Sequence, residues 1–146
     1  MAFWAEVVSM LESRLDNKSQ KIFDPTRTQN YYLYMPTQSR SWISAHVSQS
    51  RGCIGVYLTF ERGQIGNRLY EGLSAEREVI DRELGVDVKW ESVDGKHAVY
   101  CEKYLGDDIL TKHRAPAKEW LCDRMNRFVT AFRPRIEGMT SQLNMQ

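Results

Sequence analysis

Apolar side chains recur every three or four residues at the start of the chain, with Glu6 and Glu12 among the polar positions between them. The apolar positions are Phe3, Trp4, Val7, Val8, Leu11 and Leu15. This spacing puts the apolar groups on one side of a helix. It predicts an amphipathic helix over residues 2–16. The following segment, residues 16–28, is polar and contains Asp24-Pro25, which favours a loop.

The pattern changes to strict alternation between Gln29 and Phe60, which predicts strands at about residues 29–35, 41–48 and 53–60. Short turn-forming segments link the strands, so we expect an antiparallel meander. One face carries mainly aliphatic side chains: Tyr31, Leu33, Met35, Ile43, Ala45, Val47, Ile54, Val56, Leu58 and Phe60. The other face carries Tyr32, Tyr34, Trp42, His46 and Tyr57.

Helical spacing returns at about residues 65–84, where Leu69, Leu73, Glu76, Ile80 and Leu84 form one stripe. Gly85 is placed as the C-terminal cap of this helix. Two strands are predicted next, at residues 86–93 and 97–104. They are joined by Asp94-Gly95, the strongest short-range hairpin signal in the chain.

A last helix is predicted to open with Pro116 in its first turn. Its inward residues are Trp120, Leu121, Met125, Phe128, Val129 and Phe132. We expect it to end near Arg133, because Pro134 disfavours a helical conformation in the residue before it. Residues 137–146 are then expected to be a flexible C-terminal tail.

The predicted order is α-β-β-β-α-β-β-α, an α+β fold with helices on one face of an antiparallel sheet. A chain of 146 residues is long enough to bury its own core, and we expect a single domain over residues 1–136. With helices on one face, the aromatic face would be left for solvent, a second subunit or a ligand.

The N-terminus and the cysteines indicate the cellular compartment. Glu6 and Glu12 interrupt what would have to be the apolar part of a signal peptide, and no basic segment precedes them. No apolar stretch approaches the roughly 20 residues of a membrane span. We therefore expect a cytoplasmic protein. Cys53, Cys101 and Cys122 form no CxxC pair and are expected to be reduced, buried thiols.

The net charge is only +1, but basic residues concentrate between residues 112 and 135. Seven basic residues stand there against Glu119 and Asp123: Lys112, Arg114, Lys118, Arg124, Arg127, Arg133 and Arg135. Two interpretations stay open. The stripe is either a solvated helix face, whose basic groups are stabilised by the negative C-terminal end of the helix dipole, or a site that binds phosphate or another acid.

The aromatic face admits three interpretations. With Arg40 and Arg51 near the strand ends, its rings could stack on the bases of single-stranded nucleic acid while the arginines hold phosphate. Tyr, Trp and Arg are also enriched in protein interfaces, including those between identical subunits. Finally, tyrosines simply favour strands.

Catalytic motifs are incomplete. Asp87-Val-Lys89 and Asp94-Gly-Lys96 have the spacing of a metal-dependent nuclease, but no acid on a preceding strand accompanies them. His46-Val-Ser48 matches half of a two-histidine phosphoesterase motif, and neither His97 nor His113 supplies the other half. There is no glycine-rich nucleotide loop. We expect no cofactor and no metal.

Several short segments together resemble the bacterial domain of unknown function 4268 family over about residues 3–136. They are Phe3-Trp4, residues 29–32, 43–47, Arg51, residues 54–58, 80–85, 88–91 and 128–135. The resemblance implies an accessory role in bacterial or phage defence or DNA metabolism. It carries no established catalytic residues.

The favoured hypothesis is a non-enzymatic, homodimeric interaction module that binds a protein partner. The alternatives are a single-stranded nucleic-acid-binding accessory domain and a divergent metal-dependent nuclease or phosphoesterase. The candidate binding residues are Tyr32, Tyr34, Arg40, Trp42, His46, Arg51, Tyr57, Arg124, Arg127 and Arg135.

Overall fold

A computed structural model describes residues 3–25 and 30–144, and these residues form one antiparallel sheet and four α-helices. The predicted starts at Ala2 and Gln29 lie outside the described residues. The strands are β1 (Asn30–Tyr34), β2 (Ser41–Ser48), β3 (Cys53–Phe60), β4 (Lys89–Val93) and β5 (Lys96–Tyr104). Their order across the sheet is β1-β2-β3-β5-β4. The predicted meander is confirmed, whereas β4 is shorter than expected because residues 86–88 still connect the preceding helix to the sheet.

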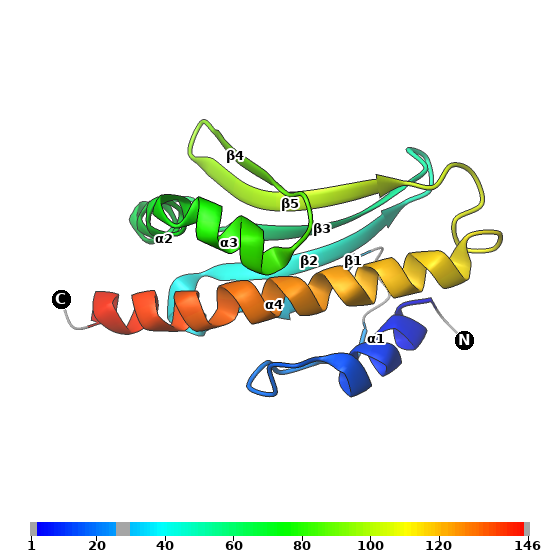
Figure 1. Ribbon diagram of the computed structural model, residues 1–146, viewed down its shortest axis with the longest axis horizontal. Helices are drawn as coiled ribbons and strands as arrows, with labels where there is room; N and C mark the ends of the chain where they lie inside the picture. Colours follow the sequence, from blue (N-terminus) through cyan, green and yellow to red (C-terminus); the bar gives the residue numbers. More distant parts are fainter. Residues whose placement is uncertain (1–2, 26–29, 145–146) are drawn as a thin grey trace.

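The helices all lie on one face of the sheet (Figure 1), which confirms the predicted α+β architecture. They are α1 (Phe3–Arg14), α2 (Gln64–Ala75), α3 (Arg77–Leu84) and α4 (Arg114–Asn144). The long α4 crosses β2 and β3 and packs against both α1 and α3, while α2 packs on β5. The core therefore lies between α4 and the aliphatic face of the sheet.

Strand alternation fills this core as the sequence predicts. Leu33 and Leu58 flank Ile43 on the two neighbouring strands, and Tyr31 lies opposite Ala45. All five are buried. Successive side chains of a strand point to opposite faces, so the intervening residues of β1 and β2 must lie on the other side of the sheet.

The predicted helix over residues 65–84 is wrong in one respect, because the structure has two helices there. Glu76 adopts φ −105° and ψ 16°, which lies outside the helical region. Its side chain is exposed, whereas the other predicted stripe residues are buried: Leu69, Leu73, Ile80 and Leu84. Gly85 has φ 69° and donates its N–H to the Asp81 carbonyl, which confirms the predicted cap.

The prediction that the last helix ends near Arg133 is also wrong. Pro134 lies inside α4, and residues 137–144, expected as a flexible tail, are the last helical turns. Residues 145–146 lie outside the described part. Proline removes the hydrogen bond to the carbonyl four residues earlier, here Thr130. Both Thr130 and Pro134 are exposed, so water can bond that carbonyl.

Packing beyond Pro134 explains why the helix continues. Ile136 and Thr140 are buried, and the Thr140 hydroxyl donates to the Ile136 carbonyl at 2.6 Å. Met139 lies over Gly72 of α2, so closely that a Cβ there would fall 2.2 Å from the Met139 methyl group. Burial of Ile136 and Thr140, together with the contact between Met139 and α2, offsets the missing hydrogen bond.

The predicted β4–β5 hairpin is confirmed. Asp94 and Gly95 have φ values of 51° and 79°, as a two-residue type I′ turn requires. Within the described residues, no helix has the length and hydropathy needed to cross a membrane.

Candidate functional site

No described helix covers the second face of the sheet, which we call the open face. It comprises Asn30, Tyr32, Tyr34, Trp42, Ser44, His46, Tyr57, Thr59, Lys89, Glu91, Val93, Lys96, Ala98, Tyr100 and Glu102. The five predicted aromatic residues therefore share one surface. They extend to the sheet edge, where Tyr34 is 55% exposed.

The centre of the open face is a row that crosses all five strands. Strand pairing places Tyr32, Ser44, Tyr57, Tyr100 and Lys89 side by side in that order. The Tyr57 and Tyr100 rings are stacked, with centroids 4.7 Å apart and planes inclined by 4°. The Lys89 ammonium lies 6.0 Å from the Tyr100 ring centroid. The row is thus a mainly aromatic surface with a cation at one end.

A glycine supports the middle of this surface. His46 lies opposite Gly55 on β3, and the His46 and Tyr57 ring centroids are 4.8 Å apart. A Cβ at Gly55 would fall 3.0 Å from Tyr57 Cε1 and 3.1 Å from His46 Nε2. Burial lowers the pKa of His46. Burial also raises the pKa of Tyr57, and the nearby Glu102 carboxylate raises it further. Both rings are therefore mainly uncharged at neutral pH.

The charged groups of the open face occur as acid and base together. Arg51 Nη1 lies 3.6 Å from Glu102 Oε2. The Tyr100 hydroxyl donates to Glu91 at 2.9 Å. Arg51 also donates to the Tyr104 hydroxyl at 3.4 Å. Lys89 and Arg51 are thus matched by two nearby carboxylates, whereas Lys96, which shares this face with Ala98 and Tyr100, is a third basic group.

Sequence reasoning missed Tyr100, Glu102 and Tyr104. Their alternation within residues 97–104 was visible, but the strand order that sets β5 beside β3 was not. Of the predicted arginines, Arg51 borders the open face. Arg40 lies at the other end of β2, where its guanidinium is 3.7 Å from a Glu61 carboxylate oxygen.

The basic stripe lies in the helical layer, on the other side of the sheet. Arg124 and Arg127 both bind Asp123, and Arg127 also donates to the Leu84 carbonyl at 2.7 Å. Arg135 pairs with Glu83 at 2.6 Å. These contacts tie α4 to α3 and to its own neighbouring turns. Of the stripe, Arg133 reaches the main-chain carbonyl of Tyr34 at the sheet edge, whereas Arg124, Arg127 and Arg135 are not brought to the aromatic residues.

The structure separates His97 from His46, the two histidines that a phosphoesterase site would have to combine. His97 lies on the helical side, where it stacks on Tyr70 at 4.5 Å and bonds Asn67 at 2.7 Å, so it cannot meet His46. Residues 3–25 and 30–144 contain no cluster of three His, Cys, Asp or Glu side chains suited to a metal. The three thiols are free and buried, and burial raises the pKa of Cys101 to about 11.

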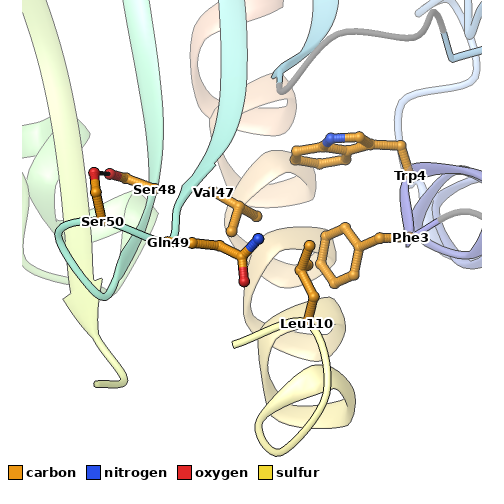
Figure 2. A pocket seen from close by; sticks show the side chains of 7 residues that line it. All are labelled: Phe3, Trp4, Val47, Ser48, Gln49, Ser50 and Leu110. Carbon is orange, nitrogen blue, oxygen red and sulfur yellow. Dashed lines mark hydrogen bonds between the residues drawn. The ribbon is translucent and has the colours of Figure 1, made fainter. Parts of the chain in front are cut away.

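A separate cavity of about 340 Å³ lies where α1 meets the β2–β3 turn and the loop before α4 (Figure 2). Its apolar walls are Phe3, Trp4, Val47 and Leu110. Ser48, Gln49 and Ser50 form the rim. The Ser48 and Ser50 hydroxyls lie 3.4 Å apart. All seven lining residues are uncharged, so the cavity favours an apolar group over an ion.

Comparison with known proteins identifies the family. No curated protein and no solved structure matches the chain. A family model described as a domain of unknown function, DUF4268, matches residues 1–136. This match covers every strand of the open face and α4 as far as Ile136. The resemblance inferred from the short sequence segments is confirmed, and the chain belongs to the DUF4268 family.

Proposed function

We propose that this protein is a non-enzymatic interaction module that binds a protein partner through the open face. One observation carries the proposal: a stacked aromatic row, centred on Tyr57 and Tyr100, is left uncovered by the described helices. Tyr and Trp side chains dominate the binding energy of many protein interfaces. Tyr34 and Trp42 extend this surface toward the sheet edge.

Charge favours protein over nucleic acid as the ligand. Proteins that bind single strands combine stacking rings with a positive groove that follows the phosphates. On the open face, Glu91 and Glu102 offset two of the three basic groups, Lys89, Lys96 and Arg51. Arg124, Arg127 and Arg135 of α4 lie in the other layer and are engaged with Asp123 and Glu83. A phosphate backbone would meet carboxylates beside the stacked rings.

The setting that we propose is bacterial or phage defence or DNA metabolism, with the protein acting as a homodimer. The proposal of this biological setting is based on the family likeness alone. The proposal of the contact surface is based on the geometry of the sheet.

Paired substitutions test the proposed function. Trp42→Ala and Tyr34→Ser should each remove a specific partner from the proteins that co-purify with the tagged chain, as quantified by mass spectrometry. Val79→Ser, an exposed apolar position on α3, is the matched control and should retain the partner. Unchanged co-purification with both open-face variants would contradict the proposal.

A fluorescent single-stranded oligonucleotide, titrated at low salt, tests the alternative. We expect no binding. Binding that weakens steeply as salt is added, and that is lost in Trp42→Ala, would favour the nucleic-acid alternative.

A further inference from the structure

The two edges of the sheet differ in how their main-chain groups are satisfied. In a two-residue hairpin the residues that flank the turn exchange both hydrogen bonds, and bonding then alternates along the strand. Val93 and Lys96 flank the Asp94-Gly95 turn, so the N–H and C=O groups of Trp90 and Ser92 point away from β5. Within the described residues, these outward groups have no hydrogen-bond partner.

The opposite edge, at β1, is partly capped. The Tyr34 carbonyl accepts from Gln20 Nε2 at 3.1 Å and from Arg133 Nη1 at 3.2 Å. Side chains of the loop after α1 and of α4 therefore occupy that edge. An exposed edge strand with free main-chain groups is a template for pairing with another strand. Among the described residues, β4 offers such an edge.

The charges of β4 select one pairing. Lys89 and Glu91 are both exposed and both lie on the open face. A two-fold axis at Trp90 places Lys89 of each copy opposite Glu91 of the other. The main-chain N–H and C=O groups of the two Trp90 residues then hydrogen-bond to each other. An axis at Glu91 would set the two Glu91 carboxylates opposite each other, which is unfavourable. We infer that β4 pairs antiparallel with β4 of a second copy of this chain, centred on Trp90.

The Trp90 side chain does not obstruct this pairing. Its Nε1 donates to Asp81 of α3 at 2.8 Å, and its ring packs 6.1 Å from Phe132, inside its own helical layer. Only main-chain atoms of Trp90 therefore meet at the two-fold axis. Pairing joins the two sheets with both open faces on the same side. It leaves the stacked Tyr57 and Tyr100 rings uncovered, so the dimer is independent of partner binding at the open face.

Charge reversal tests the register. The dissociation constant of the wild-type dimer is measured by sedimentation equilibrium. Lys89→Glu and Glu91→Lys should each weaken the dimer by about tenfold or more, because each creates two like-charge pairs. The double variant, with both changes, should return to within about threefold of the wild type because the pairs are restored in reverse. Lys103→Glu, on the interior strand β5, is the control and should change nothing.

A zero-length carbodiimide cross-link provides a second readout. Labelled and unlabelled copies are mixed, and the Lys89 amine should form an amide with the Glu91 carboxylate between chains of different label. A monomer at all concentrations, a dimer that none of the charge variants weakens, or a Lys89–Glu91 cross-link confined to chains of one label would overturn the inference.

Discussion

Gly55 determines how the central rings of the open face lie. His46 and Tyr57 occupy the space that a side chain at this position would fill. Gly55→Ala should therefore displace both rings and destabilise the protein by about 1–3 kcal/mol, the usual cost of overpacking. Urea unfolding measures the loss, and NMR shifts of the two rings report their movement.

Gly138→Ala is the control for that substitution, because nothing lies within 4 Å of a Cβ at Gly138. Alanine is favoured over glycine in a helix by roughly 0.5–1 kcal/mol, so this variant should be neutral or more stable. Equal effects of the two substitutions would show that the packing at Gly55 has no special role.

Glu6 links α1 to α4 and makes stability depend on pH. Its carboxylate accepts from Arg114 and from Lys118, the latter at 3.0 Å, and these hydrogen bonds lower its pKa to about 2. Because the folded pKa lies below the ordinary value of 4.5, this stabilisation is complete above about pH 4.5. It is lost as the pH falls toward 2.

Glu6→Gln should therefore lower stability at neutral pH and flatten its dependence between pH 4.5 and 2. Urea unfolding across this range measures both effects. Glu12→Gln, at an exposed position of the same helix, is the comparison. A Glu6→Gln profile parallel to that of the wild type would refute the proposed linkage.

At the scale of elements, Pro134 is retained in α4 although it weakens the helix. Pro134→Ala restores an N–H for the Thr130 carbonyl, and proline costs about 3 kcal/mol relative to alanine in a helix interior. We expect a gain of roughly 1–3 kcal/mol in unfolding free energy, measured by urea titration. A loss of stability would mean that the packing of Ile136 and Thr140 requires a distortion at the proline.

The sequence predicts well the elements in which one side is buried, because burial imposes a regular spacing on the apolar residues. Ile43, Ala45 and Val47 alternate because one side of β2 faces α4. Local rules failed where tertiary contacts decide the outcome. Pro134 is a local stop signal, but Met139 and Gly72 provide packing beyond it. Tyr100 belongs to the candidate site because the strand order places β5 next to β3, and no local pattern reveals that order.

At the scale of the whole molecule, the two features that suggested binding lie on opposite sides of the sheet. The basic residues of α4 are engaged with acids in the helical layer. The aromatic residues form an uncovered surface on which carboxylates lie among the basic groups. This separation is the reason that we propose protein contact as the function and a structural role for Arg124, Arg127 and Arg135.

The most direct measurement is photo-crosslinking inside the producing cell, with benzoylphenylalanine in place of Tyr34 on the open face or Val79 on α3. Both positions are about half exposed, at 55% and 49%, so they differ mainly in the surface that they report. We predict a discrete protein adduct from position 34 that position 79 does not yield. Adducts to nucleic acid from position 34, or the same protein adducts from both positions, would contradict the proposed contact surface.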